Sequence, residues 1–250
     1  MYFTDLSDSQ WQVIEKLIEK QRKRKYDLRE IVNALIYILK TGCQWRMLPN
    51  DLPPYPIVFY YFKKWKNNHT LEQINKELLS LRRVQLKQNQ QPSLCIIDSQ
   101  SVKNSERGLP DKSYDGYKKI NGRKRHIAVD KNGYIMAVHI NEAGRHDSQD
   151  AESIIKKMKE LYKSVKVAVG DSAYKGKLIK QLKNKYKIVL KIVKAIKSRG
   201  FKVAAKRWIV ERTFSWMNYQ RRLSKDYEAL FCSAAAFVYL FNLNLMLKNF

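Results

Sequence analysis

SLCIIDSQSV, residues 93–102, is a β-rich run in which a single acid, Asp98, follows four apolar residues. A run this apolar is typical of a central strand of a sheet. A charge inside such a strand is costly unless it is paired or binds a metal. The run also divides the chain, because helical periodicity dominates before it and strands alternate with helices after it.

The segments after this run predict an α/β fold. Two strand-like segments meet at Asn132-Gly133, a dipeptide that strongly favours a β-hairpin. The order of segments is β-β-β-α-β-α-β-α, which indicates a mixed sheet with helices packed on it. The segments are strands at 93–102, 122–133 and 134–144, a helix at 147–162, a strand at 165–174, a helix at 175–186, a strand at 187–194 and a helix from about Arg207.

The first part of the chain predicts a small all-α module. Capping-box patterns begin at Ser7, Asp27 and Thr70, and each precedes apolar residues at helical spacing. A short aromatic helix is expected from Pro56 to about Asn67. We therefore expect a helical DNA-binding domain at 1–85, a polar linker at 86–93 and the α/β domain at 94–250.

The third helix of this module carries a cluster of lysines, Lys63, Lys64 and Lys66. A basic third helix is compatible with helix-turn-helix DNA binding. A solvated helix face explains the same lysines equally well.

The composition is strongly basic. The chain of 250 residues has 49 Lys and Arg against 23 Asp and Glu, a net charge of +26. Such an excess favours a polyanionic partner, and nucleic acid is the usual one; a solubility trend is the alternative. The three cysteines are far apart, which argues against disulfides and structural zinc and indicates buried thiols in a reducing compartment.

The termini indicate neither secretion nor a membrane. The first residues lack the pattern of a secretory signal. The longest apolar run near the C-terminus, 234–241, is well short of the roughly 18 residues of a membrane span. We expect this segment to be a core helix and the protein to be cytoplasmic.

Three acids stand out against the basic background: Asp98, Asp171 at the end of a strand, and Glu211 on a late amphipathic helix. Each has a structural alternative. Asp98 could pair with a buried arginine, Asp171 could cap the next helix, and Glu211 could pair with Arg207 one turn earlier. Three acids that converge would repel each other unless a divalent cation with a preference for oxygen, such as Mg²⁺, lies between them.

Five segments closely resemble the DDE transposases of bacterial insertion sequences, specifically the insertion-sequence-five family within the insertion-sequence-four/five superfamily. The matches run in order from about residue 3 to the end of the chain. They include DLREIVNALIYILKTGCQWRMLPNDLPP (27–54), IIDSQSVK (96–103), GRKRHIAVD (122–130), VGDSAYKG (169–176) and RWIVERTFSWMNYQRRLSKDYE (207–228).

The resemblance implies a ribonuclease-H-like catalytic domain with a catalytic, metal-holding triad of Asp98, Asp171 and Glu211. It implies dependence on Mg²⁺ or Mn²⁺, with two ions, and strand cleavage and joining at terminal inverted repeats of double-stranded DNA. The wider group has a Y-x2-R-x3-E-x6-K signature. Here Arg207 and Glu211 fit it, but Ala204 and Asn218 replace the Tyr and the Lys.

Basic residues around these motifs are the candidates for binding DNA. Residues 103–125 form a basic arm with eight Lys or Arg against three acids, suited to tracking phosphates. Late arginines could replace the missing lysine of the signature. The candidates outside the third helix are Lys103, Arg123, Lys124, Arg125, Arg207, Arg212, Arg221 and Arg222.

We therefore expect a DNA transposase that acts as a homodimer on inverted-repeat and target DNA and is associated with the bacterial nucleoid when bound. Two alternatives remain open. One is a catalytically silent, transposase-derived DNA-binding protein, and the other is a ribonuclease-H-like nuclease. The lone His146, before the helix at 147–162, is interpreted as structural.

Overall fold

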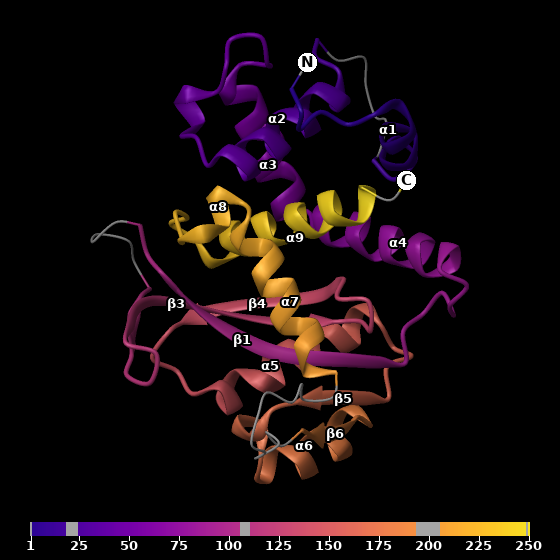
Figure 1. Cartoon of the computed structure of the whole chain (residues 1–250), viewed down its shortest axis with the longest axis vertical. Coiled ribbons are helices and arrows are strands. Elements are labelled where there is room, and N and C mark those ends of the chain that lie inside the picture. The colour runs from indigo at the N-terminus through magenta and orange to yellow at the C-terminus, as the bar shows by residue number, and fades with distance from the viewer. Residues whose placement is uncertain (1, 19–24, 106–110, 194–205, 249) are drawn as a thin grey trace, which may run out of the picture.

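The structure is a computed structural model and describes residues 2–18, 25–105, 111–193, 206–248 and 250. Helices α1 to α3 form one end of the molecule, and a six-stranded sheet with its helices forms the other (Figure 1). Helices α4 and α9 lie between these two parts.

The N-terminal helices begin largely where the capping patterns predict. Ser7 forms a complete capping box with Gln10, and the Asp27 carboxylate accepts from the Arg29 amide. The cap predicted at Thr70 is wrong, because Thr70 is itself the first helical residue and its amide donates to the Asn68 side chain. The elements are α1 (Asp8–Glu15), α2 (Leu28–Thr41), the 3₁₀ turn η1 (Trp45–Met47), α3 (Tyr55–Asn67) and α4 (Thr70–Gln85).

The sheet is mixed, as expected. Strand β1 lies at its centre, antiparallel to β3 and parallel to β5, and the predicted hairpin joins β3 to β4. The order is β4-β3-β1-β5-β6, with β2 pairing the start of β3. The strands are β1 (Leu94–Lys103), β2 (Ser113–Asp115), β3 (Ile120–Val129), β4 (Ile135–Glu142), β5 (Val167–Gly170) and β6 (Val189–Ile192).

The helices of this part cover both faces of the sheet. Helix α5 packs on β3 and β4, and α7 crosses β1. Three antiparallel strands followed by two parallel ones, with helices between them, is the ribonuclease-H-like arrangement expected from the sequence. The helical elements are α5 (Asp147–Leu161), η2 (Ser172–Tyr174), α6 (Lys177–Tyr186), α7 (Arg207–Asn218), α8 (Arg221–Ser224) and α9 (Phe231–Leu247).

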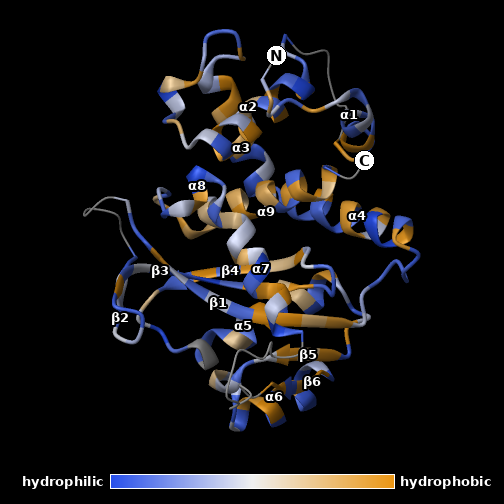
Figure 2. Ribbon diagram, viewed as in Figure 1, coloured by the Kyte–Doolittle hydropathy of each residue, from blue (hydrophilic) through white to orange (hydrophobic). Residues whose placement is uncertain are grey.

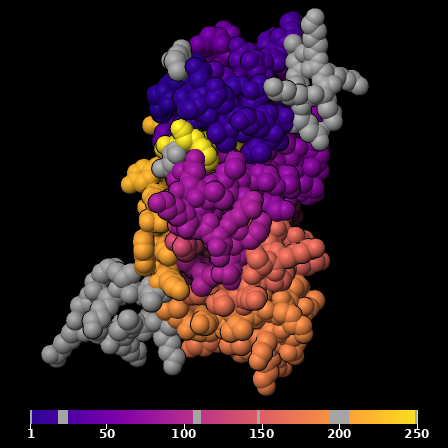
Figure 3. Space-filling model, turned by 90° about the vertical axis from the view of Figure 1, so that its right-hand side faces the viewer, coloured from indigo at the N-terminus to yellow at the C-terminus, as the bar shows by residue number. Residues whose placement is uncertain are grey.

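Helix α9 is buried on nearly every side, as its composition predicts. Figure 2 shows the hydropathy of its residues. It packs against α2, α3, α4 and β4, so the predicted helical and α/β domains share one hydrophobic core. In Figure 3 the C-terminal segment emerges between the N-terminal helices and α4. Among the described helices, none combines the length and apolar character needed to cross a membrane.

Helix α9 also covers the β4 edge of the sheet. The Asn242 side chain accepts from the Ile135 amide of β4 and donates to its carbonyl, and the Tyr239 hydroxyl accepts from the Val138 amide. Asn242 also donates to Asn75 of α4. These bonds satisfy backbone groups that an uncovered edge strand would expose.

The cysteines only partly follow the prediction. All three are free thiols. Cys95 is buried in β1 and Cys43 is partly buried, but Cys232 is exposed at the start of α9, so the prediction of buried thiols is wrong there.

A buried ion pair joins α4 to the β3–β4 turn. Arg83 lies 2.8 Å from the Asp130 carboxylate, and both side chains are almost fully buried. Asp130 also accepts from the Asn132 and Tyr134 amides, so it is the turn residue that the sequence predicts.

Replacing Asp130 with alanine should lower the free energy of unfolding by about 3–5 kcal/mol, because it leaves the Arg83 charge buried without a partner. Urea denaturation measures this change. Asp8→Ala is the matched control: Asp8 pairs with Arg29 at 2.6 Å but is 84% exposed, so its loss should cost under about 1 kcal/mol. Similar losses in both variants would contradict the importance of the buried pair.

Candidate active site

The register of two parallel strands brings the first two acids together. Ile96 of β1 pairs with Val169 of β5. Two residues further along each chain lie Asp98 and Asp171, so both acids are at the same level of the sheet. Neighbouring strands are about 4.8 Å apart, and residues two apart share a face.

A tight turn fixes Asp171 at the end of β5. Its carboxylate accepts from the Ala173 amide at 2.9 Å and so caps η2, as the structural alternative foresaw. Gly170 permits this turn, since a Cβ there would lie 2.8 Å from the Tyr174 ring and 3.2 Å from Ile97. Asp171 can therefore both cap η2 and be part of the site.

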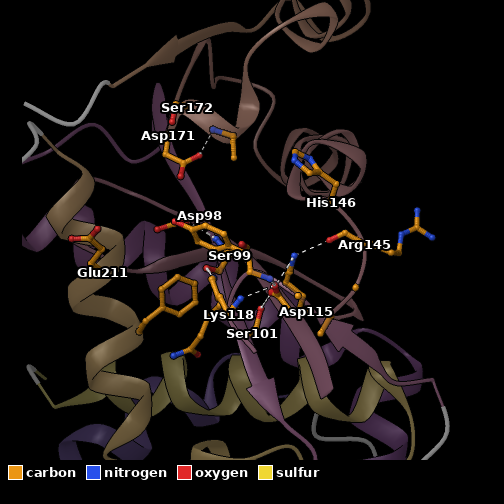
Figure 4. A pocket seen from close by; sticks show the side chains of 18 of the residues that line it. Asp98, Ser99, Ser101, Asp115, Lys118, Arg145, His146, Asp171, Ser172 and Glu211 are labelled. Atoms are coloured by element: carbon orange, nitrogen blue, oxygen red, sulfur yellow. Dashed lines mark hydrogen bonds and ion pairs between the residues drawn. The ribbon is translucent and has the colours of Figure 1, made fainter. Parts of the chain in front are cut away.

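Helix α7 supplies the third acid. Val210, Phe214 and Met217 are buried, as the predicted apolar stripe requires. This packing on the sheet leaves Glu211 facing outward, half exposed. Figure 4 shows Asp98, Asp171 and Glu211 arranged around one opening, from β1, from the end of β5 and from α7.

All three acids line an open cleft of about 960 Å³. Its opposite wall is mostly basic and comes from β2, the turn after it, β3 and the loop before α5. The lining residues on that wall include Asp115, Tyr117, Lys118, Lys124, Arg145 and His146. The exposed His146 thus reaches the cleft, although the sequence favoured a structural role for it.

Arg207 faces all three carboxylates. Its Nε lies 3.1 Å from Glu211 Oε1 and 4.0 Å from Asp98 Oδ2, and its Nη2 lies 3.7 Å from Asp171 Oδ2. The pair that the sequence suggested for Glu211 is therefore present, and it extends to the two aspartates.

The acids suit a divalent metal chemically. Three carboxylates provide the hard oxygen ligands that Mg²⁺ and Mn²⁺ prefer, and a positive group already lies where they converge. In the conformation seen here, no three His, Cys, Asp or Glu side chains among the described residues are arranged to hold a metal ion. The donor set fits, but binding would require the carboxylates to close together.

The Asp98 carboxyl has a raised pKa. Burial raises its pKa to about 6, against the opposing effects of the Ser99 amide and Arg207. The nearby Asp171 charge raises the pKa further. Asp98 therefore carries its charge at neutral pH but takes up a proton in mild acid.

The basic wall is held in place by Asp115, which the sequence analysis missed. Asp115 accepts from the Ser101 hydroxyl at 2.6 Å and from the Tyr117 and Lys118 amides. Burial opposes ionisation, but these bonds and Lys124 prevail and lower the pKa of Asp115. The only sequence signal for this wall was the charge of the arm at 103–125, of which residues 106–110 lie outside the described chain.

Four of the basic candidates are exposed as a DNA contact requires, and the others are partly or fully buried. Lys63 and Lys64 of α3, Lys103 and Arg221 are exposed. Lys66 instead lies partly buried, with its Nζ 3.3 Å from the Ser233 hydroxyl of α9.

Arg123 and Arg125 share one strand face, as predicted, but that face is buried. Arg123 pairs with Asp226 and donates to the Glu228 carbonyl at 2.6 Å. Arg125 donates to the Leu223 carbonyl. Both arginines hold the segment between α8 and α9 on the sheet, a different role from the expected DNA contact.

Arg212 is partly buried and Arg222 is buried, and both contact other parts of the fold. Arg212 lies between the Trp208 and Trp216 rings, at 4.7 and 4.4 Å, and donates to the Asn132 carbonyl. Arg222 forms a buried ion pair with Glu228 at 2.6 Å. Of the late arginines, Arg207 lines the cleft and Arg221 is exposed.

Two family models match the chain. Residues 6–75 match a family described as "Putative transposase of IS4/5 family", and residues 89–245, more than half of the chain, match one described as "Transposase DDE domain". No curated protein matches the chain.

Solved structures with distant similarity include the Drosophila P element transposase strand transfer complex and the Mos1 transposase paired-end complex with left transposon end. The first has 13% identity and a TM-score of 0.37, and the match covers 76% of this chain and 45% of that one. The second has 8% identity and a TM-score of 0.26, and covers 69% and 61%. The chain thus spans less than two thirds of either relative.

In the metal-free protein, the Asp98 carboxyl should titrate with a midpoint near pH 6, about two units above an ordinary aspartate. The carboxyl will be protonated below this pH and charged above it. NMR of protein with ¹³C-labelled aspartate carboxyls measures the midpoint, and Asp98→Asn assigns the signal by removing it. A midpoint near 4 would show that burial does not dominate at Asp98.

Proposed function

Because the chain belongs to the DDE transposases of the IS4/5 type, we propose that it binds the terminal inverted repeats of an insertion sequence and catalyses metal-dependent DNA cleavage and strand transfer. The observation that carries this proposal is the cleft lined by Asp98, Asp171 and Glu211. Their carboxylates come from three elements far apart in the sequence and lie within ion-pair distance of one guanidinium.

Membership in the DDE family implies dependence on a divalent metal. We propose that Asp98, Asp171 and Glu211 hold Mg²⁺ or Mn²⁺, as two ions. Bound there, the metal would lower the pKa of the attacking hydroxyl and stabilise charge on the phosphate. The acids themselves serve as ligands, so their charge, and that of the partly buried Asp98 above all, must be available at working pH.

The two walls of the cleft have complementary tasks in this proposal. The acids lie on one wall, and the exposed Lys118 and Arg145 lie on the other, where the buried Lys124 donates to the Arg145 carbonyl. A phosphodiester between them would be held by the basic wall with its reacting phosphate against the acids. The Asp115 hydrogen bonds keep that wall in place before DNA arrives, which reduces the entropy lost on binding.

We propose that residues 1–85 form the module that reads the inverted repeat, with residues 86–93 as the linker to a catalytic domain at 94–250. The exposed lysines of α3, Lys63 and Lys64, support this assignment. They flank a shallow pocket of about 480 Å³ that includes Phe59 and Tyr60, so cationic and aromatic groups occur together there.

The joining of two element ends requires two active sites in one assembly. We therefore propose a homodimer on double-stranded DNA. The bacterial cytoplasm and its nucleoid, where such DNA is found, remain the predicted location.

Cleavage of a labelled duplex carrying the element's own inverted repeat tests the activity. With Mg²⁺ the wild type should nick at the repeat end, and with EDTA it should not. Asp98→Asn and Glu211→Gln should each reduce the rate by at least about a hundredfold, since even the loss of a group that only supports a metal ligand costs 10–100-fold. Glu30→Gln, an exposed acid of α2, should leave the rate unchanged.

The outcomes of this assay separate the alternatives. Tight binding without nicking would indicate a silent DNA-binding protein. Cleavage of an RNA–DNA hybrid in preference to the repeat would indicate a ribonuclease-H-like nuclease. Undiminished nicking by Asp98→Asn would refute the assignment of the triad.

The proposed role of α3 makes a separate prediction about DNA affinity. Lys63→Ala and Lys64→Ala should weaken duplex binding and each reduce the slope of log K against log salt by about 1, because each removes a phosphate contact. Lys66→Ala is the control within the same helix, since its ammonium group contacts Ser233. Binding measured by fluorescence anisotropy over a salt series should show no slope change for Lys66→Ala. Equal effects in all three variants would contradict the assignment.

A further inference from the structure

The contacts of Arg207 with the three acids are ionic but loose. Two of its three nitrogen–oxygen distances are 3.7 and 4.0 Å, beyond hydrogen-bond length. Its Nε is buried and makes no hydrogen bond of good geometry, even to Glu211 at 3.1 Å. A bidentate arginine–carboxylate pair is shorter and more rigid. The guanidinium is thus held by the charge of the cleft and not by a fixed fork of hydrogen bonds.

The charge balance around Arg207 is incomplete. When all three acids are ionised, one positive charge faces three negative ones, which leaves a deficit that a divalent cation would fill. The Asp98 and Glu211 carboxylates face Nε of this broad, flat group, and the Asp171 carboxylate faces Nη2. Ligands of Mg²⁺ or Mn²⁺ must instead approach a single point to about 2.0–2.2 Å. With Arg207 between these acids, the described residues form no closed metal site.

The Arg207 side chain can move away from the three acids, whereas the buried arginines are enclosed by the fold. Its side chain is 32% exposed, whereas that of Arg123 is fully buried. It lies on the first turn of α7 at the cleft, so its guanidinium can move toward solvent or DNA without becoming a buried, unpaired charge.

We propose that Arg207 is a displaceable counter-ion. It neutralises Asp98, Asp171 and Glu211 while no metal is bound, is displaced when divalent cations enter, and then contacts the DNA backbone in the cleft. This inference rests on the proposed metal-holding role of the three acids. Arg207 is then a positioning residue that links metal entry to DNA contact, because it cannot serve the acids and a phosphate fully at the same time.

Metal binding by the full chain without DNA tests whether Arg207 competes with divalent cations for the three acids. Titration with Mn²⁺ alone, followed by electron paramagnetic resonance of the free ion, should show that Arg207→Gln binds Mn²⁺ about tenfold more tightly than wild type. A tenfold change corresponds to about 1.4 kcal/mol, within the roughly 1–3 kcal/mol by which binding at one place typically changes affinity at another. Arg221→Gln removes an equal charge from an exposed position on α8 and should change the affinity less than about twofold.

Two further variants separate the possible failures. Arg207→Lys keeps the charge and should restore affinity to near the wild-type value, which a loss of folding in Arg207→Gln could not explain. Asp98→Asn should abolish tight Mn²⁺ binding. If it does not, the metal site itself is wrong and the proposed function fails with it. If Asp98→Asn behaves as expected but Arg207→Gln binds Mn²⁺ equally or more weakly than wild type, only the counter-ion role is overturned.

Thermal unfolding tests the counter-ion role without a measurement of metal affinity. Without metal, Arg207→Gln should melt below wild type, because the three acids lose the ion-pair partner that they share. With saturating Mn²⁺ the difference should shrink or reverse, since metal replaces the lost charge. If the difference in melting temperature is the same with and without Mn²⁺, Arg207 is a permanent structural partner of the acids and the counter-ion role is overturned.

The proposed contact of Arg207 with the DNA backbone predicts an effect on the salt dependence of DNA binding that appears only with metal. In Ca²⁺, a divalent cation that also takes oxygen ligands, Arg207→Gln should bind an inverted-repeat duplex with a salt slope smaller than wild type by about 1. In EDTA the two slopes should be equal, because the guanidinium is then paired with the acids. Equal slopes in Ca²⁺ would overturn the contact with DNA.

Discussion

The mutual repulsion of three carboxylates constrains which charges the catalytic half of this fold places around them. The parallel register of β1 and β5 forces Asp98 and Asp171 to the same level, and α7 brings Glu211 to them. A nearby cation relieves this repulsion, and so does protonation of one of the acids. Arg207, one turn before Glu211 on the same helix, supplies one charge. Burial raises the pKa of Asp98 although the Ser99 amide, Arg207 and Lys118 all oppose the rise.

Much of this site could be predicted because its acids occur where local sequence is informative. Asp98 interrupts an apolar strand and Asp171 ends one, and both features are visible without a structure. The resemblance then connected them with Glu211. The contacts of Arg207 with the two aspartates could not be predicted, since helical spacing reports only on neighbours within one helix. Contacts across the cleft depend on how α7 crosses the sheet.

The basic residues were predicted less well, for a physical reason. A charge excess of +26 indicates a polyanionic partner but does not say which arginines meet it. Arg123, Arg125 and Arg222 are buried because backbone carbonyls and acids of the segment 223–229 require donors. A guanidinium with five donors suits that task as well as it suits phosphate. Similarly, Asp115 escaped notice because its partners come from three separate segments.

The place of α9 at the centre of the fold bears on how the protein is made. Residues 231–247 leave the ribosome after every element they pack against, yet they fill the space between α2, α3, α4 and β4. Until then, the nascent N-terminal helices lack their apolar partner and β4 has an uncovered edge, a condition that invites aggregation. Folding of the two halves is therefore completed together and late, which favours chaperone engagement during synthesis over stepwise maturation of independent domains.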